Sequence, residues 1–346
     1  MYTAQQIRTL EIELSSNCQA SCPLCLRNFH GATYNKGYTV KSLTVSEIKQ
    51  ILPTEFVAQL DTIIFEGNLG DAIVVSDLAD TVEYLRSCNP HCDIELHTNA
   101  SAGSKQTWVT LAEQRVRVFF ALDGLADTHH LYRRGTNWQK IIDNAGIFMS
   151  AGGDAIWKFI PLTTNQHQQE DCRRLSVELG FSSFAVMSDQ RQNCHVFDAQ
   201  GEYQYSIGNP KGPKDFKQAV RDYEMSGEHQ DLRPVPKRID CYADKRKYLY
   251  LDALGDVYPC CYLGSQPRTF DRTGGVQKYV HKRVDDIMHN NNLFENTIDT
   301  AIDWFNQIPP KWNAPMSDRL AACDNVCGEN TNYIEVSKND YNDSSI

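Results

Sequence analysis

Polar and apolar positions vary in two ways along the first half of the chain. Short stretches in which apolar and polar residues alternate predict strands, and each precedes a longer stretch that predicts a helix. The predicted strands are Thr9–Ser15, Thr62–Glu66, Asp93–His97, Val116–Leu122, Ala155–Pro161 and Ser183–Met187. The predicted helices are Ser46–Leu52, Asp77–Ser87, Ser104–Glu113, Trp138–Ala151 and Gln166–Leu179. This order predicts the α/β class, with βα units around a parallel sheet.

From residue 188 the pattern changes. Residues 188–240 are polar and rich in turn formers, so we expect a connecting segment; a cover over the active site is the alternative, since long loops often carry function. Residues 241–336 are expected to form a small second α+β domain, in which strand-like stretches on either side of Gly255 predict a β-hairpin. The tail, residues 337–346, is expected to be frayed.

The composition narrows the class of protein. The 346 residues, 41% hydrophobic and 23% charged, can bury a full core. No long apolar run or basic-then-apolar start is present, so we expect no membrane span and no signal peptide. The net charge of −10 argues against a large nucleic-acid interface. Twelve cysteines without a secretory signal indicate a reducing cytoplasm and ligation of a metal or cluster.

Three cysteines follow the first predicted strand. Cys18, Cys22 and Cys25 have the spacing C-x3-C-x2-C and lie in the loop at the carboxyl end of that strand, where α/β barrels place their chemistry. Three thiolates can bind three irons of a four-iron cubane, which leaves the fourth iron open to another ligand. The spacing alone also suits zinc, or a cluster whose fourth ligand lies elsewhere.

This motif, together with the six βα units that follow it, resembles the radical S-adenosylmethionine (radical SAM) superfamily. The resemblance implies an open, partial (β/α)6 barrel over residues 1–187 and a 4Fe–4S cluster whose open iron binds the amino and carboxylate groups of SAM. It also implies a reductant of the flavodoxin or ferredoxin type. The reduced cluster would cleave SAM to a 5′-deoxyadenosyl radical, which abstracts a hydrogen atom from the substrate.

Two strand ends resemble the positions that contact SAM in this family. Glu66, Gly67 and Asn68 follow the second predicted strand in a variant of the family's Gly-Gly-Glu-Pro stretch, which implies contacts with the SAM amine. Thr98 and Asn99 end the third strand in a stretch that resembles the family's Thr-Asn-Gly. Turn glycines and an Asx-turn are the structural alternatives.

The later strands supply further candidates. The fourth strand ends in Leu-Asp-Gly and precedes Arg-Arg-Gly, which is similar to the subfamily with extra clusters. This similarity implies that Arg134, or alternatively Arg133, pairs with the SAM carboxylate and that Asp123 contacts the substrate or braces the loop. His167 is a candidate for proton transfer, although a histidine at a helix start is usually structural. Cys194 or Cys261 is a candidate hydrogen donor, if the reaction is an epimerisation.

A second group of cysteines lies far downstream. The run from Cys241 to Cys260 has the spacing C-x13-G-x4-C, and Cys323 and Cys327 form a C-x3-C pair. Together they resemble the SPASM/twitch extension of radical SAM enzymes, which binds auxiliary 4Fe–4S clusters. Five cysteines suffice for one cluster, so we expect the shorter twitch form with these four as ligands and Cys261 left over. A structural zinc site with four thiolates is the alternative.

A fully ligated auxiliary cluster implies an electron acceptor for the substrate radical. We therefore expect a net oxidation, either a dehydrogenation or the formation of a C–C or C–X bond. Cys18 lies close to the start of the chain, where no fused leader-binding domain fits, so we favour a small-molecule substrate, or a peptide delivered without a fused reader. A maturase that cross-links or epimerises a ribosomal peptide is the alternative. A non-catalytic iron–sulfur or zinc protein is the alternative of a different class.

Overall fold

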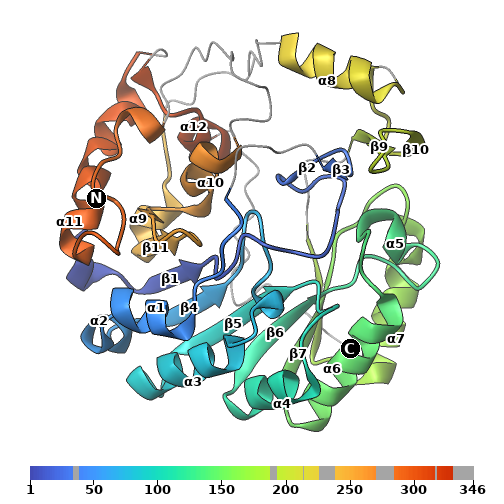
Figure 1. The fold of residues 1–346 in the computed structure, drawn as a ribbon, viewed down its shortest axis with the longest axis horizontal. Helices are drawn as coiled ribbons and strands as arrows, with labels where there is room; N and C mark the ends of the chain where they lie inside the picture. Colours follow the sequence, from blue (N-terminus) through green and yellow to red (C-terminus); the bar gives the residue numbers. More distant parts are fainter. Residues whose placement is uncertain are drawn as a thin grey trace.

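The alternating stretches of the sequence form one mixed sheet. The structure, a computed structural model, describes residues 1–33, 39–187, 193–212, 214–225, 238–269, 284–315 and 318–329. Eight strands lie in the order β12-β11-β1-β4-β5-β6-β7-β8, and every neighbouring pair is parallel except β11 and β12 (Figure 1). These strands are β1 (Thr9–Ile12), β4 (Thr62–Phe65), β5 (Asp93–Thr98), β6 (Val116–Ala121), β7 (Asp154–Phe159), β8 (Ser183–Val186), β11 (Tyr248–Leu251) and β12 (Val257–Tyr258).

The remaining elements are helices and two small strand pairs. The pairs are β2 (Asn28–Phe29) with β3 (Ala32–Thr33), and β9 (Cys194–Phe197) with β10 (Tyr203–Ile207). The helices are α1 (Val45–Ile51), α2 (Thr54–Ala58), α3 (Leu78–Cys88), α4 (Lys105–Glu113), α5 (His129–Tyr132), α6 (Trp138–Ser150), α7 (Gln169–Leu179), α8 (Phe216–Met225), α9 (Tyr242–Arg246), α10 (Cys261–Thr269), α11 (Ile298–Ile302) and α12 (Ala321–Cys327). Short 3₁₀ turns are η1 (Ala4–Gln6), η2 (Ala72–Val74), η3 (Gln166–Gln168), η5 (Val284–Asp286), η6 (Asp303–Gln307) and η7 (Pro309–Asn313).

The α/β class and the parallel sheet predicted from the sequence are confirmed. The six predicted strands are β1 and β4 to β8, with only their ends shifted. The five predicted helices are α1, α3, α4, α6 and α7, and the last begins with the turn η3. In the described ranges no helix combines the length and apolar character needed to cross a membrane.

The period-two pattern of the strands separates two different faces of the sheet. One set of alternate positions, including Leu10, Ile63 and Phe120, is buried in the large apolar core beneath the helices. The other set turns polar side chains to the opposite, concave face: Glu11, Glu95, His97, Arg117 and Lys158. The same face also carries a small apolar cluster of Phe119, Ile156 and Ala185, so it combines charged and apolar side chains.

The C-terminal region continues this sheet. The hairpin predicted around Gly255 is present as β11 and β12, and β11 pairs in parallel with β1, so that Thr9 lies opposite Tyr248 and Ile12 opposite Leu251. An exposed β1 edge would leave unpaired backbone groups, and β11 satisfies them. Residues of the C-terminal region, such as Trp304, share the core of the barrel. The domain boundary expected at residue 240 thus separates two parts of the chain that share one sheet and one core.

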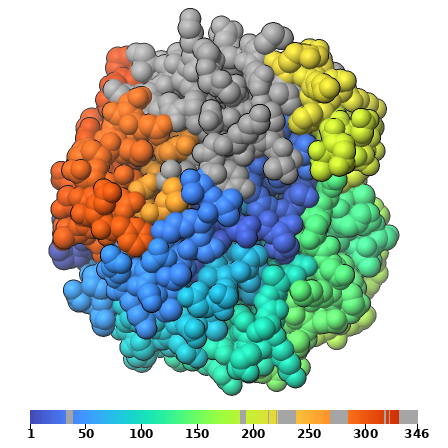
Figure 2. Space-filling view, viewed as in Figure 1, coloured from blue at the N-terminus to red at the C-terminus, as the bar shows by residue number. Residues whose placement is uncertain are grey.

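The polar segment predicted as a connection contains regular structure. The hairpin β9–β10 packs against the loop of the first three cysteines, with Cys194, Val196 and Ile207 buried beside Ala20 and Cys22. The buried positions of these short strands give little signal in a polar segment. Figure 2 shows this region, in yellow and yellow-green, on the opposite side of the visible face from the orange C-terminal residues. Residues 337–346, expected to be frayed, lie outside the described part of the chain.

Candidate active site

The first three cysteines lie in a loop that connects β1 to β2. Cys22 is buried, whereas Cys18 and Cys25 are partly exposed. A turn brings Cys25 N to 3.1 Å from Cys22 O. The buried guanidinium of Arg27 donates to Cys18 O at 2.7 Å and also to Ala20 O. Arg27 therefore holds the loop in a fixed curve beside the carboxyl ends of the parallel strands.

Nitrogen donors surround the sulfur atoms of this loop. Asn99 Nδ2 and Ala20 N each lie 3.4 Å from Cys18 Sγ, and Arg27 N lies 3.5 Å from Cys25 Sγ. Burial raises the pKa of the Cys18 thiol to about 12, so a thiolate there needs a bound cation. Hydrogen bonds to sulfur stabilise iron–thiolate ligation and tune its potential. The three cysteines and their donors fit a 4Fe–4S cluster.

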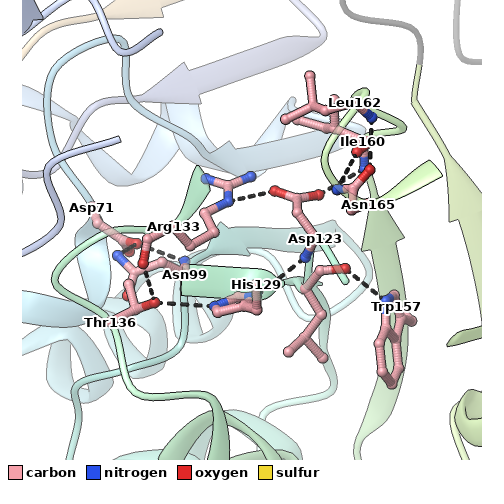
Figure 3. A network of polar contacts seen from close by, with 11 residues as sticks. Asp71, Asn99, Asp123, His129, Arg133, Thr136, Trp157, Ile160, Leu162 and Asn165 are labelled. Atoms are coloured by element: carbon pink, nitrogen blue, oxygen red, sulfur yellow. Dashed lines mark hydrogen bonds and ion pairs between the residues drawn. The ribbon is translucent and has the colours of Figure 1, made fainter. Parts of the chain in front are cut away.

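Asn99 joins the cysteine loop to a buried carboxylate. Its backbone nitrogen and Nδ2 donate to Asp71 Oδ2 at 2.8 and 2.5 Å (Figure 3). Its Oδ1 accepts from Gln19 Nε2 at 2.6 Å. Burial raises the pKa of Asp71, which also accepts from Ile73 N at the start of η2. Asn99, one of the residues predicted to bind SAM, is thus in direct contact with a cysteine sulfur.

The glycine loop after β4 lies against the residues that lead into Cys18. Glu13 Oε1 accepts from Leu69 N at 2.6 Å and from Gly70 N at 2.9 Å. A Cβ atom on Gly70 would lie 1.7 Å from Ser15 O, so only glycine allows this approach. Asp71 N completes the contact by donating to Asn17 O at 2.9 Å. The loop therefore lies directly beside the cysteine loop, as the resemblance implied.

A buried ion pair lies next to Cys22. Arg133 Nε lies 2.6 Å from Asp123 Oδ2, and Asp123 Oδ1 accepts from Ile160 N at 2.6 Å (Figure 3). Although burial opposes it, Asp123 and then Cys22 raise the pKa of Arg133. Arg134 instead donates to Phe197 O at 2.6 Å, on the β9–β10 hairpin. Of the two arginines weighed as SAM partners, Arg133 is therefore the one beside the cysteines.

The concave face holds an ion pair that the sequence analysis missed. Lys158 Nζ lies 3.1 Å from Glu66 Oε1 and 2.9 Å from His97 Nδ1, and His97 stacks on Phe119 with ring centroids 4.1 Å apart. Against the effect of burial, His97 and Lys158 lower the pKa of Glu66 to about 2. The Glu66 side chain remains 43% exposed. Lys158 is a charged residue within an otherwise largely apolar strand, β7, and this position could have identified it as a candidate site residue.

Other predicted site residues have structural partners or lie elsewhere. Asn68 Nδ2 donates to Tyr250 Oη at 3.0 Å and to Cys261 O at 2.9 Å. Thr98 Oγ1 accepts from Ala100 N at 2.9 Å, within the turn after β5.

The two catalytic candidates after the barrel strands lie apart. His167 is exposed on η3. Cys194 is buried on β9 in the same apolar cluster as Cys22, and burial raises its pKa to about 12.

The four cysteines predicted as auxiliary ligands lie around one pocket. Its other walls are largely apolar, and the cysteines are Cys241, Cys260, Cys323 and Cys327. Burial raises the pKa of Cys260 to about 12, and a hydrogen bond with Cys327 lowers the pKa of Cys241. Four soft thiol donors in an apolar pocket fit an all-cysteine iron–sulfur cluster.

Cys261 faces away from that pocket. Its sulfur lies 4.0 Å from Tyr242 Oη, and after burial the neighbouring Glu11 is the main group that raises its pKa. Adjacent side chains at the start of α10 diverge, so Cys260 faces the pocket and Cys261 faces the concave side of the sheet. This divergence agrees with leaving Cys261 out of the ligand set.

No disulfide joins any of the twelve cysteines, all of which lie in the described ranges. Within the same ranges, no three His, Cys, Asp or Glu side chains converge to hold a single metal ion. A four-iron cluster does not require such convergence, because each cysteine binds a separate iron and the sulfur atoms stay apart.

Comparisons with known proteins bear on the fold. No family model matches the sequence, and no curated protein matches it. The structure is similar to SuiB from Streptococcus suis, with a TM-score of 0.54 and 15% identity over 86% of this chain and 66% of that chain. SuiB bound to its precursor peptide SuiA gives a TM-score of 0.52 and 13% identity over 92% and 76%. The enzyme anSMEcpe with bound AdoMet gives 0.53 and 14% over 86% and 77%.

These solved structures are radical SAM enzymes, and at such low identity the similarity concerns the fold. The chain has the radical SAM fold, which confirms the fold implied by the first cysteine motif. It spans just under two thirds of the SuiB chain in the first of these matches.

Proposed function

We propose that the protein is a radical SAM enzyme that modifies a peptide. The contact between Cys18 and Asn99 carries this proposal, because it joins the three-cysteine loop to the strand ends that would hold SAM. The structural similarity to SuiB bound to its precursor peptide SuiA supports a peptide substrate over the small molecule favoured by the sequence. The similarity to anSMEcpe with bound AdoMet supports SAM as the cofactor.

Cys18, Cys22 and Cys25 would hold the catalytic 4Fe–4S cluster, which when bound to SAM and reduced supplies the 5′-deoxyadenosyl radical. The chain's own residues orient these components. Arg27 fixes the cysteine loop, and Asn99 donates to Cys18 while it positions Asp71. Gly67 and Gly70 allow the neighbouring backbone to approach the same region.

The inner face of the sheet would receive the substrate. Glu66 and Lys158 form an ion pair there that is open on the Glu66 side. Arg133, which is paired with Asp123, is near enough to act on the pKa of Glu66 and is itself affected by Cys22. The β9–β10 hairpin packs over the cysteine loop and limits access of water from that side. These residues would bind and orient a peptide segment beneath the cluster.

Cys241, Cys260, Cys323 and Cys327 would hold one auxiliary 4Fe–4S cluster. With four thiolate ligands it has no open iron, and it would accept an electron from the substrate radical in a net oxidation. A flavodoxin or ferredoxin of a reducing cytoplasm would supply the electron that starts the reaction.

Anaerobic reconstitution tests this proposal. We expect about eight irons per chain, corresponding to two cubanes, and 5′-deoxyadenosine on addition of SAM and dithionite. Replacement of Cys18, Cys22 and Cys25 by alanine should leave one cluster and abolish SAM cleavage. Zinc with negligible iron would instead identify a non-catalytic zinc protein. If added small molecules are consumed and peptides are not, the peptide substrate is refuted and a small-molecule substrate is supported.

A further inference from the structure

A chain of hydrogen bonds connects the two groups of cysteines. Asn68, in the glycine loop, donates both of its described amide hydrogen bonds to the C-terminal region, at Tyr250 Oη and Cys261 O. Cys261 follows Cys260, whose side chain lines the auxiliary pocket. A shift of the backbone at the start of α10 therefore acts directly on Asn68.

Glu13 holds the same loop from the other side. One carboxyl oxygen accepts from Leu69 N and Gly70 N, and the other accepts from the Tyr250 hydroxyl that also contacts Asn68. The Glu13 side chain is buried, and burial raises its pKa to about 7. Tyr250 is thus hydrogen-bonded to two points of the loop support at once.

The loop transmits position onward to the first cysteines. Gly70 packs closely against the chain before Cys18, because a Cβ atom added to it would lie 1.7 Å from Ser15 O. Asp71, the next residue, accepts hydrogen bonds from Asn99. Asn99 in turn contacts Cys18 Sγ at 3.4 Å. Packed elements of this kind shift between discrete arrangements rather than deform smoothly.

We infer that Asn68 is a positioning residue that couples the auxiliary cysteine pocket to the SAM-binding loop, so that loading of the auxiliary site raises the affinity for SAM. The inference rests on the proposed function for its ligands. The hydrogen bonds that connect Cys261 through Asn68 to the glycine loop join protein groups only, so they can be tested without a bound cluster or SAM. Because coupling between two sites is reciprocal, SAM also tightens binding at the auxiliary site.

A double-mutant cycle tests the coupling. SAM affinity is measured anaerobically from the change in the electron paramagnetic resonance spectrum of the reduced cluster, in wild-type protein, Asn68→Ala, Cys327→Ser and the double variant. Cys327→Ser, whose loss of iron is verified separately, should weaken SAM binding roughly tenfold, the effect of one or two hydrogen bonds. In the Asn68→Ala background the same change should have less than about a twofold effect. Additive effects would overturn the inference.

Asn89→Ala is the matched control. Asn89 also donates from one amide nitrogen to backbone carbonyls, at Val57 O and Leu60 O, but far from both cysteine groups. It should lower stability without changing SAM affinity. An equal loss of affinity in Asn89→Ala would show a general effect of destabilisation and contradict the role of Asn68.

Hydrogen–deuterium exchange separates the link from the chemistry. In cluster-free protein, Asn68→Ala and Tyr250→Phe should each speed exchange of the Leu69 and Gly70 amides at least severalfold, while the α4 amides stay unchanged. Faster exchange in these variants, combined with a wild-type protein that does not cleave SAM, would support the hydrogen-bonded link and refute the proposed function. Unchanged exchange in both variants would refute the coupling through Asn68, even if the wild-type protein cleaves SAM.

Discussion

Asn99 Nδ2 lies 3.4 Å from the sulfur of Cys18 and 2.5 Å from an oxygen of Asp71. One amide group therefore contacts a predicted iron ligand and a buried carboxylate. Hydrogen bonds to sulfur raise the reduction potential of iron–sulfur clusters, because they stabilise the added negative charge. The relationship between Asn99 and Cys18 makes the potential of the first cluster sensitive to one side chain.

Replacement of Asn99 by alanine should make the potential of this cluster more negative while iron remains bound. Spectroscopic redox titration measures the shift. The matched control is Asn144→Ala, which removes two amide hydrogen bonds to Ala100 O and Ala102 O on the other side of the same turn but none to sulfur. An equal shift in both variants would attribute the change to loosening of the turn.

Asp123→Asn should destabilise the protein because it leaves Arg133 without its buried counter-charge. Loss of one member of a buried pair costs about 3 kcal/mol or more. Asp154→Asn, which breaks the more exposed pair with Arg117, should cost less than about 1 kcal/mol. Urea unfolding of the cluster-free protein measures both free energies, and equal losses would refute the special position of Asp123.

Gly70→Ala should prevent the close approach of the glycine loop to the cysteine loop. The added Cβ atom would lie 1.7 Å from Ser15 O, a backbone atom that cannot move without displacing the chain before Cys18. We expect a lower melting temperature and reduced iron binding by the first cluster. Gly146→Ala, in α6 with open space around it, should instead be neutral or stabilising by about 0.5–1 kcal/mol.

Glu11→Gln should change the pH dependence of stability. Burial, then Glu66, raises the pKa of Glu11 from 4.5 to about 8, while the hydrogen bond from Tyr248 lowers it and Glu13 adds a further small increase. The Cys261 thiol also faces this carboxyl. Between these pKa values the folded state binds one proton more than the unfolded state, so stability falls as pH rises.

In Glu11→Gln the side chain does not titrate, so its contribution to the pH dependence of stability is absent. The slope of unfolding free energy against pH should become shallower by up to about 1.4 kcal/mol per pH unit between pH 5 and 8. Urea titrations of cluster-free protein at several pH values measure it. Parallel curves for the two proteins would show that Glu11 is ionised at the same pH whether folded or unfolded.

Adjacent cysteines should behave differently. Cys260→Ser should reduce the iron content by the equivalent of the auxiliary cluster, because its side chain lines the pocket shared with Cys241, Cys323 and Cys327. Cys261→Ser should retain both clusters, since its sulfur faces Tyr242 and Glu11. Iron analysis and absorption spectra compare the two variants, and equal loss of iron would make Cys261 a ligand.

Much of the barrel could be predicted from the sequence, because strand alternation and helix periodicity are local properties. The six strands β1 and β4 to β8 and the hairpin around Gly255 followed from these patterns, whereas the short pair β2 and β3 was missed. The glycine loop after β4 could likewise be predicted to lie close to the cysteines, since consecutive parallel strands end at one edge of a sheet. The structure places Cys241, Cys260, Cys323 and Cys327 around one pocket, while their role as cluster ligands stays a prediction.

The partners of individual side chains could not be predicted in this way. The amide of Asn68 binds Tyr250 and Cys261, more than 180 residues away in sequence, and no local pattern indicates these partners. Lys158 and Glu66 come from different strands, so no local pattern reveals their ion pair. The β9–β10 hairpin was missed because its strands are only four and five residues long and lie within a polar segment.

The sequence by itself determined the α/β class, the order of the barrel strands and the two groups of cysteines, because each depends on residues close together in the chain. Only the tertiary structure decided that β11 extends the sheet beside β1 and that Arg133, rather than Arg134, lies beside Cys22. These outcomes depend on which distant surfaces bury the most apolar area and satisfy the most buried polar groups. That balance is set by the whole chain and has no local signature.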